Sequence, residues 1–166
     1  MSAVPVMLEP VGARNEPVLR ELLNLYLYDL SHLAAADPDR NGRFEYPFLD
    51  GYWTEPERHA FFAVAAGVLA GFVLINAHSE TDAEHSIAEC FVLKRHRRSG
   101  VGRAAAWAAF DRFRGSWEVC TDAENQAAIA FWRDTIASYT RGSFQERAGI
   151  GGWTGPMFLF EGRSPG

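Results

Sequence analysis

A basic turn with two glycines is the stretch of this sequence whose residue types and spacing point most directly to chemistry. The segment Arg97-Arg98-Ser99-Gly100-Val101-Gly102-Arg103 follows a short apolar run and opens an alanine-rich run typical of a helix. The first N–H groups of a helix lack partners within it, and together with the helix dipole they bind anions such as phosphate. Glycines let the backbone approach the anion, and arginines pair with its oxygens. The turn is therefore predicted to hold a phosphate-bearing ligand.

The spacing of the glycines excludes two common nucleotide-binding motifs. A dinucleotide fingerprint needs a third glycine and an acidic residue about 20 residues on, and a P-loop needs Gly-Lys-Ser/Thr. The turn has neither feature. The pattern Arg-x-x-Gly-x-Gly between a strand and a helix resembles the coenzyme A pyrophosphate loop of the GNAT acetyltransferase superfamily. This resemblance runs without a gap from Phe91, Val92 and Leu93 to Gly102.

A second stretch further along the chain extends the resemblance. Asn125, Ala128, Phe131 and Trp132 match the family's Asn-x-x-Ala-x-x-Phe-Tyr pattern except at the last position. The resemblance implies that the turn holds the coenzyme A pyrophosphate, and that these four residues border the same ligand. It also implies that the strand 91–93 offers backbone groups to the pantetheine arm and the thioester carbonyl. Asn125 has an alternative role, because asparagine before a helix is a common N-cap.

Glu89 is the candidate catalytic base. The implied reaction is transfer of an acetyl group from acetyl-CoA to an amine, which must lose a proton before it attacks the thioester. Glu89 and Phe91 lie two residues apart on the expected strand, and therefore on the same face. In the family a glutamate on this strand often serves as the base. The alternative is a strand-end carboxylate that faces solvent, with His85 or a chain of waters as the base.

The group that would protonate the leaving thiolate is missing from its usual place. The family often uses the tyrosine that ends the second pattern, but Trp132 stands there in this sequence. An indole N–H is a hydrogen-bond donor without useful acidity. Either a nearby tyrosine such as Tyr139 takes this role, or the thiolate leaves unprotonated.

The acceptor side of the site is expected to come from the first part of the chain. Apolar residues at helical spacing predict a helix that begins after Asn15, as its cap, and extends to about Leu33. Tyr26, Tyr28 and Asp29 near its end are candidate acceptor-binding residues, or else part of a solvated face. The aromatic segment 44–53, interrupted by proline and glycine, reads as a packed irregular loop that could fold over the site.

The remaining segments predict a mixed sheet. Strands are expected at 4–8, 61–65, 68–75, 87–93, 117–121, 143–148 and 153–160, and helices at 101–114 and 126–136. Strand, helix and strand over 87–121 form a βαβ unit, so these two strands should be parallel. The resemblance implies an α/β (α+β) fold, a GNAT-type mixed central sheet of about six to seven strands flanked by about four helices. We expect one acyl-CoA N-acyltransferase domain over 1–166, with a frayed tail at 161–166.

Composition limits the possible partners. The net charge of −5 disfavours nucleic acid and anionic membranes as general partners. The apolar segment 60–77 could suggest a membrane span, but it divides at Ala66-Gly67 and reads better as a hairpin. The polar loop 78–85 has two histidines and three acids without ligand spacing, so no metal is expected. Two alternatives to catalysis remain: a coenzyme A-binding module of the same fold, and nucleic-acid contact through the turn 94–103.

The cysteines and the N-terminus bear on location. Cys90 and Cys120 each sit in an apolar strand-like run and read as reduced core residues, and 1–7 lacks the pattern of a signal peptide. We therefore expect a cytoplasmic protein, either a monomer or a homodimer. Its partners would be acetyl-CoA and an amine that the sequence does not identify.

Overall fold

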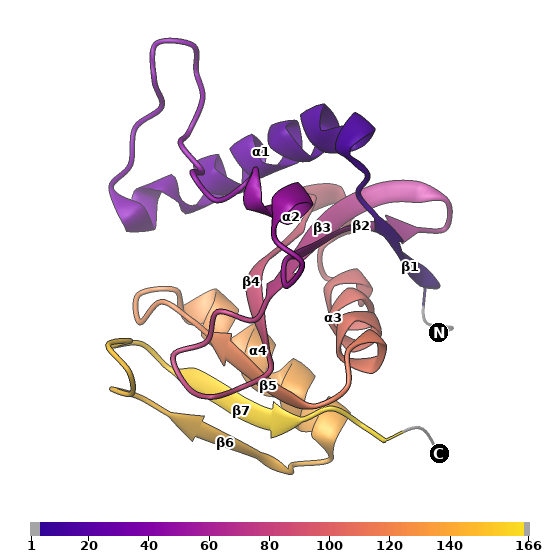
Figure 1. The fold of residues 1–166 in the computed structure, drawn as a ribbon, viewed down its shortest axis with the longest axis vertical. Helices are drawn as coiled ribbons and strands as arrows, with labels where there is room; N and C mark the ends of the chain where they lie inside the picture. Colours follow the sequence, from indigo (N-terminus) through magenta and orange to yellow (C-terminus); the bar gives the residue numbers. More distant parts are fainter. Residues whose placement is uncertain (1–3, 165–166) are drawn as a thin grey trace.

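The structure, a computed structural model, describes residues 4–164. In chain order its elements are β1 (Val6–Pro10), the 3₁₀ turn η1 (Ala13–Asn15), α1 (Glu16–Ala34), α2 (Gly51–Thr54), β2 (His59–Ala65), β3 (Val68–Asn76), β4 (His85–Val92), η2 (Lys94–His96), α3 (Val101–Arg112), β5 (Ser116–Cys120), α4 (Gln126–Thr140), β6 (Phe144–Arg147) and β7 (Met157–Glu161) (Figure 1). The mixed α/β class with a central sheet is confirmed.

The strands form one seven-stranded sheet in the order β1-β2-β3-β4-β5-β7-β6. All neighbouring pairs are antiparallel except β4 and β5, which are parallel as the βαβ unit predicts. The segment 60–77 is the β2–β3 hairpin, which confirms the hairpin prediction. The last two strands are placed in the sheet in reverse of their chain order, so that β7 lies between β5 and β6.

The two parallel strands pair only where they begin. His85 lies opposite Trp117 and Ser86 opposite Glu118, and no further pair joins β4 to β5. Beyond these residues β4 continues to Val92, so one of its edges is left without a neighbouring strand. Such an edge exposes backbone N–H and C=O groups that can bind an extended ligand.

A bulge in β4 lies next to the candidate base. Leu74 of β3 pairs with Glu89, but the next residue, Ile75, pairs with Ile87, so Ala88 is the extra residue. A bulge re-aims the side chains that flank it and strengthens the local twist. As a result Ala88 and Glu89 both lie on the face of the sheet that α1 covers.

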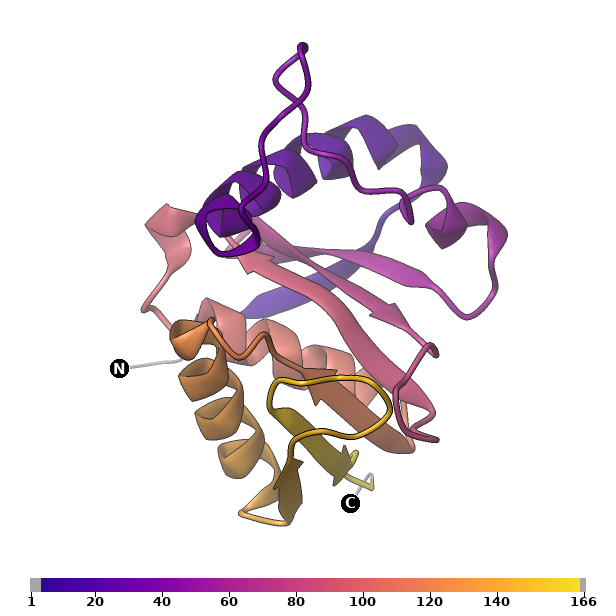
Figure 2. The same cartoon turned by 90° about the vertical axis from the view of Figure 1, so that its left-hand side faces the viewer.

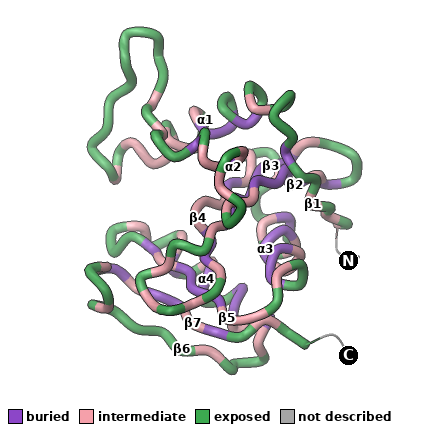
Figure 3. Tube along the Cα trace, viewed as in Figure 1, coloured by how far each residue is buried: buried purple, intermediate pink, exposed green. Residues whose placement is uncertain are grey.

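Two hydrophobic cores lie on opposite faces of the sheet. Figure 2 shows α1 on one side of β2–β4 and α3 on the other. On the first side Leu19 and Leu23 of α1 pack in one cluster with Phe72 and Phe91 of the sheet. On the second side Phe110 of α3 packs in a larger cluster with residues of α4, β5 and β7. Buried residues follow the strands and the inner faces of the helices (Figure 3).

The structure corrects several expected details. Asn15 does not cap α1 through its side chain, because the 3₁₀ turn η1 leads directly into the helix. The segment 44–53 contains the start of a short helix, α2. The helix α4 extends to Thr140, four residues past its expected end.

The expected frayed tail is wrong for the part of it that the structure describes. Glu161 belongs to β7, and the Gly162 N–H donates to the carbonyl of Gly115 at 2.9 Å. The Arg163 guanidinium pairs with Asp111 and lies 4.2 Å from the ring centroid of Tyr139. Residues 165–166 lie outside the described residues. The described part of the tail is therefore held at Arg163 by an ion pair and a cation–π contact.

Candidate active site

The start of α3 has the geometry of an anion site. The N-cap, Gly100, has φ +85° in the left-handed region, and no side chain caps the helix. Arg98, two residues earlier, also has a positive φ of 61°. The first turn contains no acidic residue. The N–H groups of this turn are thus not capped by a side chain and carry the positive end of the helix dipole, which fits a diphosphate.

The two glycines of the turn serve different purposes. A Cβ on Gly100 would meet nothing within 4 Å, so this glycine is required by its φ alone. A Cβ on Gly102 would lie 3.2 Å from the ring of Phe131 on α4 and 3.5 Å from Val92. Gly102 therefore lets α3 approach Phe131 closely, a packing role that the motif did not reveal.

Arg97 does not point freely toward an anion. Its Nε donates to the carbonyl oxygen of Val92 at 2.8 Å, and its Nη2 pairs with Asp29 of α1. Its guanidinium also lies 5.5 Å from the ring centroid of Phe91. Lys94 approaches the same aspartate at 3.6 Å. Arg97 thus links the acceptor-side helix to the end of β4.

The other two arginines of the turn, Arg98 and Arg103, differ in whether they form an ion pair within the chain. Arg103 pairs with Asp134 of α4, on the outside of the molecule. Arg98 is exposed, and among residues 4–164 it takes part in no ion pair. Ser99 donates from its hydroxyl to the carbonyl of His96 at 2.6 Å, which shapes the turn. Arg98 is therefore the arginine of 97–103 that no ion pair among the described residues engages.

The backbone of β4 divides between the sheet and the open edge. The N–H of Leu93 donates to Ala70 of β3 at 2.8 Å, so Leu93 and, by alternation, Phe91 face β3. Val92 lies between them and faces the edge that β5 leaves open. Of the three residues expected to offer backbone groups to a ligand, only Val92 has these groups on the open edge, and its contact with a ligand stays a prediction. In this structure its carbonyl already accepts from Arg97.

Glu89 meets α1 on the acceptor side of β4. The Tyr26 hydroxyl donates to Glu89 Oε2 at 2.6 Å. Burial raises the pKa of Glu89 from its ordinary value of 4.5 to about 7, while hydrogen bonds from Tyr26 and Tyr46 oppose the rise. A carboxyl group that titrates near neutral pH suits a general base.

Two further tyrosines, which the sequence did not single out, surround this carboxylate. Tyr46 lies in the loop before α2; burial, followed by the nearby charge of Glu89, raises its pKa well above the usual range. Tyr52 lies in α2, and burial raises its pKa to about 12. Its hydroxyl is the one buried side-chain oxygen or nitrogen without a hydrogen-bond partner in the described part of the chain. The aromatic content of 44–53 was the available signal for these residues.

The three acceptor candidates on α1 have different surroundings. Tyr26 contacts Glu89, Asp29 contacts Arg97, and Tyr28 is 65% exposed. One turn of α1 separates Tyr26 from Asp29, so a single helix face touches both Glu89 and the basic turn.

The second sequence pattern lies mainly in the packing of α4. Asn125 accepts from the N–H of Ala128 at 3.1 Å, which is the N-cap role that the sequence left as an alternative. Phe131 lies over Gly102, and Trp132 is 7% exposed within the large core. Of the four residues, Phe131 lies nearest to the basic turn. Whether any of them contacts coenzyme A stays a prediction.

The sequence matches the profile of the acetyltransferase (GNAT) family over residues 19–135, more than half of the chain. The chain belongs to the GNAT acetyltransferase family. Comparison with curated proteins gives no match. The prediction of a GNAT-type acyltransferase is thereby confirmed at the level of the family.

Solved structures of GNAT proteins share the fold over nearly the whole chain. An acetyltransferase from Thermus thermophilus has a TM-score of 0.65 and 20% identity, covering 97% of this chain and 99% of its own. Spermidine N-acetyltransferase from Vibrio cholerae, in complex with CoA and spermine, has a TM-score of 0.64 and 12% identity, covering 95% of each chain. PaiA N-acetyltransferase from Thermoplasma acidophilum, in complex with coenzyme A, has a TM-score of 0.60 and 7% identity, covering 95% and 99%.

Two alternative residues for proton transfer in this GNAT domain are wrongly placed for it. The Tyr139 hydroxyl donates to Asp111 at 2.8 Å and accepts from the Arg163 N–H at 3.1 Å. Tyr139 also lies seven residues after Trp132, and therefore about 10 Å from it along α4. The His85 ring contacts the Arg114 carbonyl oxygen at 2.8 Å. His85 also lies four residues before Glu89, which is roughly 13 Å away from it along β4. Tyr139 as the general acid and His85 as the base are therefore corrected.

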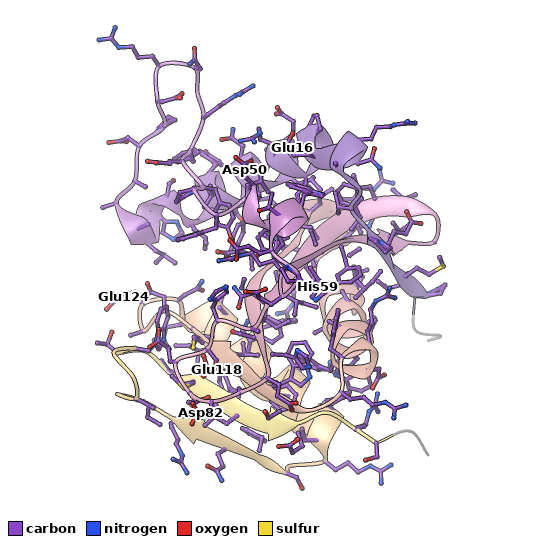
Figure 4. All side chains as sticks on the ribbon, viewed as in Figure 1. Glu16, Asp50, His59, Asp82, Glu118 and Glu124 are labelled. Atoms are coloured by element: carbon purple, nitrogen blue, oxygen red, sulfur yellow. The ribbon has the colours of Figure 1, made fainter. Side chains whose placement is uncertain are left out.

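A second buried carboxylate serves the fold. Glu118 of β5 is 1% exposed and accepts from the N–H groups of Glu80 and Thr81, each at 2.8 Å, and from the Thr81 hydroxyl at 2.6 Å. It thereby fixes the β3–β4 loop to β5, in the lower part of Figure 4, where Glu118 is labelled. Because both oxygens are bound to this loop, Glu118 is not a second base.

A surface pocket of the GNAT domain lies away from these residues. It has a volume of about 920 Å³ and is lined by 81–83, 116–117, 139–145, 159–161 and 163–164. It contains none of the donor or acceptor candidates. Among residues 4–164, none of the helices has the length and apolar character needed to cross a membrane.

Proposed function

We propose that this GNAT protein transfers an acetyl group from acetyl-CoA to an amine by direct attack in a ternary complex. The observation that carries the proposal is the arrangement of β4: Glu89 lies on one side of it, and the uncapped start of α3 follows its end. This arrangement supports Glu89, whose carboxyl group has a pKa of about 7, as a base beside the expected path of an acyl donor.

The donor would bind chiefly through backbone groups. The N–H groups at the start of α3 and the exposed Arg98 would hold the diphosphate. The open edge of β4 at Val92 would hold the pantetheine arm through the Val92 N–H and through the second lone pair of the Val92 carbonyl oxygen, which already accepts from Arg97. Acetyl-CoA supplies the thioester, and the protein supplies its position.

The proton steps fall to Glu89. The protonated amine loses one proton to the Glu89 carboxylate, and its nitrogen then forms a bond to the acetyl carbon as the bond from that carbon to sulfur breaks. The new amide nitrogen gives up its second proton, which matches the proton that the thiolate takes up, and Glu89 returns its own proton to solvent. A thiol has an ordinary pKa of about 8.5, so the coenzyme A thiolate can leave without a tyrosine acid and take up a proton afterwards. This agrees with Tyr139 being bound to Asp111.

The comparisons bear on the acceptor only by analogy. The Vibrio cholerae structure contains spermine, so polyamines belong in the first set of amines to test. Nucleic-acid contact through 94–103 has less support, because Arg97 and Arg103 are already ion-paired within the chain.

The test is release of coenzyme A thiol from acetyl-CoA, measured across a panel with spermine, simple alkylamines and peptides with a free N-terminus. Wild type is expected to release thiol with at least one amine. Glu89→Gln is expected to bind acetyl-CoA but to release far less thiol. Binding without release by wild type, across the whole panel, would indicate a coenzyme A-binding module. If wild type neither binds acetyl-CoA nor releases thiol, the proposal is refuted.

A further inference from the structure

The contact between Tyr26 and Glu89 joins residues 63 positions apart in the sequence. Tyr26 extends from α1, and Glu89 lies on the bulged part of β4. The phenol ring packs on two neighbouring rings of the sheet: its centroid lies 5.7 Å from that of Phe72, edge to face, and 5.6 Å from that of Phe91. The hydroxyl is therefore held against the carboxylate by packing as well as by the hydrogen bond.

Tyr26 is a poor candidate for binding the acceptor or for transferring a proton itself. Its O–H is already directed at Glu89 Oε2. Burial, followed by the charge of Glu89 and this hydrogen bond, raises the pKa of Tyr26 well above its ordinary value. A phenol in this state remains protonated throughout the neutral range. It can donate a hydrogen bond to a carboxylate, but it cannot protonate a thiolate favourably.

We infer that Tyr26 is a positioning residue for Glu89: its hydroxyl orients the carboxylate and stabilises the ionised form, and so sets the pH above which the base works. The role in catalysis rests on the proposed function, whereas the coupling between the two side chains does not. Without this donor the carboxylate would face the same apolar surroundings with one hydrogen bond fewer, and it would hold its proton to a higher pH.

Several other groups face Glu89 and must be included in the design. Tyr46 comes from the loop before α2 and Tyr52 from α2, whereas Cys90, the next residue on β4, packs on the opposite face of the sheet. Burial raises the pKa of the Cys90 thiol to about 12, so this thiol stays neutral. From β3 the nearby residues are the apolar Phe72 and Leu74.

The chain contains a matched control for the substitution. Tyr139 is also a buried tyrosine whose hydroxyl donates to a carboxylate, that of Asp111 at 2.8 Å, but it lies at the end of α4. Tyr26→Phe and Tyr139→Phe therefore make the same chemical change in two places. Each retains the ring, and Tyr26→Phe keeps its packing on Phe72 and Phe91.

The first readout needs no acceptor. The Glu89 carboxyl is titrated by NMR in protein carrying ¹³C-labelled glutamate, with its signal assigned by its loss in Glu89→Gln. Because a hydrogen bond to a charged group favours ionisation, Tyr26→Phe should raise the titration midpoint by about one pH unit. Tyr46→Phe should raise it less, and Tyr139→Phe should leave it unchanged. An unchanged or lowered midpoint in Tyr26→Phe would overturn the inference.

The second readout uses an amine found active in the thiol-release panel. In Tyr26→Phe the acidic limb of the pH profile of kcat/KM should move upward by the same amount as the NMR midpoint. A uniform loss of activity without a shift in this limb would contradict the positioning role. If the midpoint shifts but none of the amines in the panel causes wild type to release thiol, the proposed function fails and the coupling of Tyr26 to Glu89 stands.

Discussion

The two sides of β4 are built in different ways. The donor side is the continuous turn 94–103 and the helix that follows it, and its chemistry comes mainly from backbone N–H groups. The acceptor side combines side chains from α1, the loop before α2, α2 and β4 around one carboxylate. A local backbone site leaves a compact motif in the sequence, whereas a site assembled by the fold does not.

The same contrast applies to the arginines and the tyrosines. Within the turn 94–103, Arg97 and Arg103 form ion pairs with other helices, and the exposed Arg95 and Arg98 are in none of the ion pairs among residues 4–164. On the acceptor side, burial changes the acidity of each group around Glu89. Donor binding should therefore depend on backbone shape and charge, and the chemical step should depend on protonation.

The largest expected effect separates the two sides. Glu89→Gln should lower kcat/KM for the amine by about 100-fold or more, because a general base typically contributes that much. Its affinity for acetyl-CoA, measured by calorimetry, should remain within about twofold of wild type, the precision of the comparison. Equal losses in both quantities would mean that the two sides are not independent.

The next effect concerns the donor turn alone. Acetyl-CoA should raise the melting temperature of wild type by binding the folded state. Gly102→Glu should abolish this rise, because its side chain meets Phe131 and adds negative charge beside the diphosphate. Gly12→Glu is the control, since a Cβ on Gly12 meets nothing within 4 Å.

A second variant of the basic turn keeps the test informative if Gly102→Glu folds poorly. Arg98→Glu changes an exposed side chain and should also reduce the thermal shift strongly. A full ligand-induced shift in both folded variants would contradict the assignment of the turn to coenzyme A.

A smaller effect tests the link between the sides. Arg97→Ala should weaken coenzyme A binding roughly tenfold, as expected for one charge-assisted contact. Asp29→Asn should strengthen it, by about threefold, because it frees Arg97 and removes a negative charge near the diphosphate. Weaker binding by Asp29→Asn would instead indicate that Asp29 holds Arg97 in its binding position.

The last effect is on stability. Because the pKa of Glu89 is raised from 4.5 to about 7 on folding, its contribution is fully present below pH 4.5 and is lost as the pH rises through 7. Denaturant unfolding should thus show wild type losing stability relative to Glu89→Gln between about pH 5 and pH 8. A difference that does not change with pH would show that the carboxyl group titrates normally.

The sequence predicted the elements and the donor turn well. The strand, turn and helix around 87–114 are contiguous, and the periodicity of α1 and the β2–β3 hairpin gave these elements within a few residues. Glu89 and Phe91 were expected on one face, and both contact Tyr26. Such features depend on neighbours along the chain.

The errors arose where distant segments meet. Nothing local indicates that Arg97 pairs with Asp29, that Gly102 packs on Phe131, or that Tyr139 binds Asp111. The tail beyond β7 looked frayed because its composition is polar, yet Arg163 is fixed by Asp111 and Tyr139. Tyr46 and Tyr52 were hidden within an aromatic loop for the same reason.

The most direct test of the account is the pattern of initial rates when acetyl-CoA and an active amine are varied together. The two sides of β4 are proposed to hold donor and acceptor at once, and burial raises the pKa of both cysteine thiols, which disfavours a thiolate nucleophile. The account predicts double-reciprocal lines that intersect, which indicate a ternary complex. Parallel lines, together with an acetylated protein detected by mass spectrometry, would contradict it.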